Sequence, residues 1–203
     1  SPVGVVVGGV DGGGAFTWDG TMTSTTPLAA LDGDEVMAIA TGINARGDVV
    51  GVSATAASEL RVVVWRASGI AELAPVGELY PEALDGFPPR IDADGGIYAT
   101  VWQGGFGSIR AVAWSDGIVS VLLPEGALLS AVFSVHPTRK EAFGIAIDGA
   151  SGQAGFISRP AGDACACGPA DCSDDAWVFY VPVRHKGTGV EGSLRCVATP
   201  GAS

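Results

Sequence analysis

The chain has 203 residues and a formal net charge of −11, from 22 acidic and 11 basic side chains. A field of that sign repels phosphate, so nucleic acid is a poor partner, and no apolar run reaches the roughly 18 residues of a membrane-spanning helix. Hydrophobic residues make up 47% of the chain and charged residues 16%, a composition that indicates a packed core and argues against disorder.

Residues 1–28 contain the first of four similar segments. Its strand-like runs are "VGVVVGGV" and "GAFTWDGTMTS", and it lacks the opening strand of the later segments. Ser1 is not an initiator methionine, and the chain opens inside an apparent strand. We therefore expect that a signal peptide or an upstream segment has been removed.

Residues 36–76 form the most complete segment and predict four strands, "VMAIATGI", "DVVGVSA", "LRVVVWR" and "IAELAPV", separated by Gly, Asn, Asp or Ser turns. Residues 88–123 repeat the pattern, since "RVVVWRASGIAEL" aligns with "RAVAWSDGIVSVL". Residues 130–160 are a degraded fourth copy that ends in "QAGFISRP". The anchor aromatics of the four copies are Trp18, Trp65, Trp114 and Phe156, spaced 47, 49 and 42 residues apart.

The composition of these segments favours strands, because valine and aromatic residues are enriched and no segment keeps a helical apolar period. The strands are nearly continuously apolar, which predicts sheets covered on both faces, as when four-stranded blades stack radially. The sequence therefore predicts an all-β fold, with a four-bladed β-propeller as the leading architecture and a β-sandwich or an open β-repeat array as alternatives. In a closed ring, the last strand-like run would complete the first blade and remove exposed edges.

Residues 161–203 form a Cys-rich C-terminal segment, which we expect to close the same domain. An even, clustered cysteine count in an acidic, lysine-poor chain indicates disulfides and an oxidising compartment. Zinc is the alternative, but "CACGPADC" matches no standard paired-Cys knuckle. A bridge between the first two cysteines is disfavoured, because one intervening residue rarely allows relaxed geometry. The cysteines are Cys165, Cys167, Cys172 and Cys196.

The pattern I-N-x-x-G-x-V-V-G followed by R-a-x-x-W-x-x-G resembles the HAF family of extracellular repeats. The best matches are "INARGDVVG" with "RVVVWRASG", and "IDADGGIYA" with "RAVAWSDG". The resemblance covers residues 1 to about 160, is weaker where "VHPTRKEAFG" has lost both the Asn and the first Gly, and leaves the Cys-rich segment unmatched. It implies extracellular placement and propeller-like blades, and it supplies no catalytic residues.

Arg46-Gly47-Asp48 spells an adhesion tripeptide, but the repeat places it in the hairpin between the first two strands of a blade. Its equivalents are Asp94-Gly95-Gly96 and, approximately, Arg139-Lys140-Glu141. Glycine supplies the positive φ that such a turn needs. We interpret the tripeptide as a structural turn.

No cofactor is expected, and calcium is a weaker alternative. Asp92-Ala93-Asp94-Gly95 looks like the start of a calcium loop but lacks a downstream glutamate to close it. The loop with Asp32, Asp34 and Glu35 is a slightly better cation candidate, although a solvated loop is the simpler interpretation.

The strongest candidate binding surface is one rim of the predicted propeller, which collects alternate turns and the long insertion "GELYPEALDGFPP". Aromatic faces beside acids can stack on and hydrogen-bond a sugar ring, although packing of these rings into the loop bases is the simpler interpretation. The candidate residues are Tyr80, Phe87, Trp102 and Phe106, with Glu78, Glu82 and Asp85.

Catalysis receives little support, because the chain has two histidines and no Gly-x-Ser-x-Gly elbow, so no catalytic residue is assigned. The sequence favours a non-enzymatic binding or assembly module, extracellular or at the cell surface, with the periplasm as an alternative. Its partner would be a protein or a glycan at the cell surface. A lectin-like propeller and a secreted glycan-acting enzyme are the alternative functions.

Overall fold

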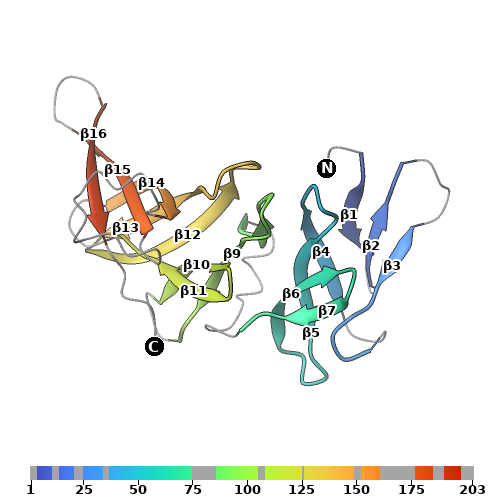
Figure 1. The fold of residues 1–203 in the computed structure, drawn as a ribbon. Helices are drawn as coiled ribbons and strands as arrows, with labels where there is room; N and C mark the ends of the chain where they lie inside the picture. The colour runs from blue at the N-terminus through green and yellow to red at the C-terminus, as the bar shows by residue number, and fades with distance from the viewer. Residues whose placement is uncertain are drawn as a thin grey trace.

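The computed structural model describes residues 4–10, 14–20, 25–33, 37–74, 86–104, 108–124, 126–148, 152–160, 177–184 and 190–197. The elements of this part of the chain are β-strands, and they form four antiparallel sheets that follow one another along the sequence (Figure 1). The all-β prediction is therefore confirmed. No helix in the described residues is long and apolar enough to cross a membrane.

Each sheet consists of strands that are consecutive in the chain. The first sheet contains β1 (Val6–Gly9), β2 (Ala15–Trp18) and β3 (Thr26–Leu28). The second contains β4 (Ala38–Ile43), β5 (Val49–Ala54), β6 (Leu60–Arg66) and β7 (Gly69–Glu72). The third contains β8 (Arg90–Ile91), β9 (Ile97–Trp102), β10 (Ile109–Ser115) and β11 (Ile118–Leu122). The fourth contains β12 (Ala127–Val135), β13 (Ala142–Asp148), β14 (Gly152–Pro160), β15 (Trp177–Arg184) and β16 (Val190–Val197).

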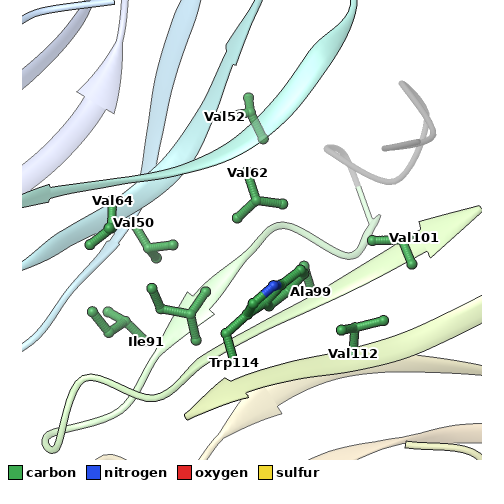
Figure 2. Packing of buried hydrophobic residues seen from close by; sticks show 10 residues of the cluster. Val50, Val52, Val62, Val64, Ile91, Ala99, Val101, Val112 and Trp114 are labelled. Carbon is green, nitrogen blue, oxygen red and sulfur yellow. The ribbon is translucent and has the colours of Figure 1, made fainter. Parts of the chain in front are cut away.

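The second and third sheets bury both of their faces, which explains why their strands are continuously apolar. In β5 and β6, Val49 and Val63 face the first sheet, while Val50 and Val64 face the third. Side chains of a strand alternate between its two faces, so only an uninterrupted apolar run can serve two interfaces. Figure 2 shows the interface between the second and third sheets, where valines of β5 and β6 meet Trp114 and its neighbours. Full burial of each such valine stabilises the fold by about 1.5–3 kcal/mol.

The first strand of the second sheet and that of the fourth sheet each contain a β-bulge. In both sheets the residue opposite the bulge is a glycine. The register shifts between Ala40 and Gly42 in β4, and between Val132 and Ser134 in β12. A Cβ atom on Gly51 would collide with the carbonyl oxygen of Ile39, and one on Gly144 would collide with that of Ala131. Glycine is needed at both positions because the bulged backbone approaches so closely.

The four sheets do not close into a ring in this structure. The first and fourth sheets lie at opposite ends of the molecule (Figure 1). The expectation that the last strand completes the first sheet is wrong here, because β16 pairs with β15 from Trp177↔Val197 to Arg184↔Val190. Two strands separated by a short connection pair with each other more readily than with a distant edge. The first sheet therefore has one strand fewer, and the fourth one strand more, than the sheets between them.

The register of the fourth sheet corrects the choice of its anchor residue. Trp65 lies opposite Val49, the first residue of β5, and Trp114 lies opposite Ile97, the first residue of β9. The residue opposite Ala142, the first residue of β13, is Ser158 and not Phe156. The predicted anchor at 156 is two residues out of register, because the fourth copy carries its aromatic ring over Gly144 instead.

Candidate functional site

The Arg46-Gly47-Asp48 tripeptide forms the turn between β4 and β5, with Gly47 at φ 84°. The Oδ1 atom of Asn44 accepts hydrogen bonds from the backbone N–H groups of Arg46 and Asp48, both at 3.0 Å. The Asp48 carboxylate accepts a hydrogen bond from Asn44 Nδ2 at 3.1 Å and lies 3.2 Å from Arg46 Nη2. Arg66 Nε approaches the same carboxylate at 4.0 Å. The acid that an adhesion receptor would need is therefore engaged within the protein.

The next hairpin, between β8 and β9, repeats this construction around a buried carboxylate. Asp92 Oδ1 accepts hydrogen bonds from the N–H groups of Asp94 and Gly96 at 2.9 and 2.8 Å. Its Oδ2 atom accepts a hydrogen bond from the hydroxyl of Tyr98 at 3.0 Å, and both side chains are buried. Burial raises the pKa of Tyr98 well above its ordinary value, and the charge of Asp92 adds to that shift. Both oxygens of Asp92 bind donors of the protein, so this carboxylate supports the turn.

A third turn of this kind joins β12 to β13, where His136 Nδ1 accepts a hydrogen bond from the N–H of Thr138 at 3.2 Å. Nearby, Lys140 Nζ lies 2.9 Å from Asp116 Oδ2 and links the fourth sheet to the β10–β11 turn of the third. This hydrogen bond is the main cause that lowers the pKa of Asp116 and raises that of Lys140. Asp116 is highly exposed, so water screens the pair and its contribution to stability is small.

The described part of the predicted aromatic rim is packed against the protein. Phe87 is half-buried, and its ring centroid lies 4.8 Å from that of Phe133 in β12, with an interplanar angle of 34°. Trp102 ends β9 and is also half-buried. Sequence reasoning did not predict the contact with Phe133, which lies at the register shift between Val132 and Ser134 in β12. The other predicted rim residues lie outside the described residues: Glu78, Tyr80, Glu82, Asp85 and Phe106.

The predicted cation and disulfide residues are only partly described. Asp32 Oδ2 accepts a hydrogen bond from the N–H of Ala56 at 2.8 Å, which ties the segment after β3 to the β5–β6 turn. Within the described residues, no group of three or more His, Cys, Asp or Glu side chains is placed to hold a metal ion. Cys196 lies in β16 opposite Val178, and its side chain is outside the description. Also outside it are Asp34, Glu35, Cys165, Cys167 and Cys172.

The surface of greatest interest follows from how consecutive sheets contact each other. We call the face that a sheet turns toward the preceding sheet its leading face. On the leading face of the second sheet, Trp65 Nε1 donates a hydrogen bond to the carbonyl of Ala29 at 2.6 Å. On that of the third sheet, Trp114 Nε1 donates to the carbonyl of Ala74 at 3.0 Å. Each carbonyl belongs to the segment that follows the last strand of the preceding sheet. Each tryptophan therefore links its own repeat to the repeat before it.

In each sheet, one cross-strand pair occupies the same place on the leading face. The pair is Val6 and Trp18 in the first sheet. In the other three sheets the two members of the pair are at most 8% exposed, whereas Val6 is 48% and Trp18 39% exposed. The first sheet therefore presents to solvent a surface that the same chain covers three times elsewhere. The covered pairs are Val49 with Trp65, Ile97 with Trp114, and Ala142 with Ser158.

Comparisons of the chain with protein-family models, with curated proteins and with solved structures gave no match. The resemblance to HAF repeats therefore rests on the motifs "INARGDVVG" and "RVVVWRASG" and their counterparts.

Proposed function

We propose that the protein is a non-enzymatic binding and assembly module, extracellular or at the cell surface, that engages a protein partner with the leading face of its first sheet. The observation that carries the proposal is the exposure of Val6 and Trp18, whose equivalents are buried in every other sheet. Large apolar side chains gathered on one exposed face are typical of protein interaction sites. Tryptophan is also among the residues that contribute most to binding at such sites.

The polar groups of the hairpin turns support a binding role over a catalytic one. Asp48, Asp92 and Asp116 each accept hydrogen bonds or ion pairs from the protein itself. A general acid or base needs to reach a substrate, and the carboxylates of Asp48 and Asp92 are engaged in their own turns.

Placement outside the cell is supported by the clustered cysteines and by the motifs shared with HAF repeats. Protease treatment of intact producing cells is expected to remove the protein, and full protection under those conditions would contradict this placement. The four-bladed propeller stays a prediction, because it requires the fourth sheet to cover the leading face of the first.

The binding proposal is tested by replacing Trp18 with the photo-cross-linking residue benzoylphenylalanine in cells that produce the protein. Irradiation is expected to give a discrete adduct whose second component is a protein. The matched control carries the same residue at Ile118, which is 40% exposed on β11 of the third sheet. Absence of an adduct at position 18, or an equal yield at position 118, would sink the proposal.

A further inference from the structure

We propose that the partner of this face is a second copy of the chain, and that copies join head to tail, with the fourth sheet of one covering the first sheet of the next. The inference rests on the proposed function and names its partner. The observation behind it is the set of contacts between neighbouring sheets, because in each of them a leading face packs against the sheet before it.

The complement of a leading face is always the outgoing side of the preceding sheet in the same chain. The second sheet covers the first with Val49, Val63 and Trp65, and the segment after β3 completes the contact. The third sheet covers the second in the same way with Trp114. In the fourth sheet Ala142 and Phe156 pack on the third. The same kind of contact between neighbouring sheets thus occurs three times. In the described chain, the two faces without a neighbouring sheet are the leading face of the first sheet and the opposite face of the fourth.

The first sheet does not have the character of a cap. Terminal units that end a repeat array carry polar outer faces, because nothing follows them. Val6, Phe16 and Trp18 lie at the leading-face positions of the first sheet, where the equivalent residues of the second are Val49, Val63 and Trp65. Phe16 is half-buried, and its ring lies over Gly8 as that of Phe156 lies over Gly144. The first sheet therefore keeps an interior surface at the outside of the molecule.

The first and fourth sheets lie at opposite ends of the molecule (Figure 1), so one copy carries the two faces of the proposed contact on different sides.

The test compares the purified full chain with its Val6→Lys and Ile118→Lys variants by sedimentation velocity over a range of concentrations. The wild-type chain is expected to form concentration-dependent oligomers. Val6→Lys places an unpaired charge in an apolar contact and should weaken association at least about tenfold. Ile118→Lys, at a similarly exposed position on another sheet, should associate like the wild type. Equal thermal unfolding of the three proteins shows that the fold is intact.

A mixing experiment tests the direction of the contact. Val6→Lys loses the leading face but keeps its fourth sheet, so the labelled variant should still bind immobilised wild-type chain. It should not bind immobilised Val6→Lys. A symmetric contact, in which first sheets meet each other, predicts no binding in either case and would overturn the inference. A wild-type chain that stays monomeric would overturn it too. If such a monomer still cross-links through position 18 to a different protein, the proposed function stands without the self-assembly.

Discussion

Replacing Tyr98 with phenylalanine tests whether the buried hairpin contact stabilises the third sheet. The substitution removes one hydroxyl from a fully buried ring and leaves the packing of that ring on Ala111 and Val132 in place. The hydroxyl donates to Asp92 Oδ2 at 3.0 Å, and a hydrogen bond to a charged group contributes about 1.5–3 kcal/mol. The free energy of unfolding should fall by about that amount, which corresponds to a decrease in Tm of roughly 3–12 °C for a chain of this size. Urea denaturation followed by tryptophan fluorescence measures the loss.

A double-mutant cycle with Asp92→Asn isolates the pair. Asparagine stands at the equivalent position 44, where its Oδ1 atom accepts both turn N–H groups, so Asp92→Asn should keep the turn. In that background the contact is between neutral groups, and Tyr98→Phe should cost only about 0.5–1.5 kcal/mol. If Tyr98→Phe lowers the free energy of unfolding of the wild-type chain by less than about 0.5 kcal/mol, the reasoning is refuted. A buried carboxylate oxygen that loses its donor should destabilise the fold by more than that.

Three further outcomes follow from the same structure. Folding raises the pKa of Tyr98 above its ordinary value near 10, so its contribution to stability is complete below that pH and is lost as the pH rises further. In urea denaturation at increasing alkaline pH, the free energy of unfolding should therefore decline less for Tyr98→Phe than for the wild type. Gly144→Ala should destabilise the fold by more than about 2 kcal/mol, because its Cβ would strike a backbone carbonyl, whereas Gly8→Ala in the same register meets only the ring of Phe16 and should cost less in the same denaturation assay. Ser158→Ala should raise stability by about 1 kcal/mol, since its Oγ atom is buried without a hydrogen-bond partner, and an unchanged or lower Tm would contradict that account.

The sequence predicted the strands of the middle sheets well, because the cause of those strands is local. Apolar runs such as "RVVVW" end at turn residues, and Gly47 and Gly95 mark the two hairpins by their positive φ. The side chains that cap these turns were less visible. Asn44 and Asp92 fall at matching positions when "INARGDVVG" is aligned with "IDADGGIYA", but their hydrogen bonds to the turn depend on backbone direction. The bulge in β12 was also hidden, because it arises from the pairing of two strands and leaves no distinct residue pattern.

Register explains why the fourth copy misled the alignment. A sequence alignment matches ring to ring and so places Phe156 with the tryptophans. In the structure, Ala142 is the first residue of β13 and pairs with Ser158 of β14. Ser158 therefore occupies the position that tryptophan occupies in the other sheets. The aromatic ring has moved by two residues and remains on the same face, because side chains of a strand repeat every second residue. Alignment by residue type therefore preserves the face of a strand but not the position along it.

The exposure of the repeat tryptophans could not be predicted from their motif. Trp18, Trp65 and Trp114 occupy the same place in the repeat and would be judged alike from the sequence. Two of them are buried and bind a carbonyl of the preceding sheet, while Trp18 is 39% exposed. The difference comes from what lies in front of each sheet, which is a property of the array and not of the strand. A repeat that contacts only its neighbours makes interior and end surfaces from one pattern. The same strand pattern therefore gives a buried surface in the second and third sheets and an exposed one in the first.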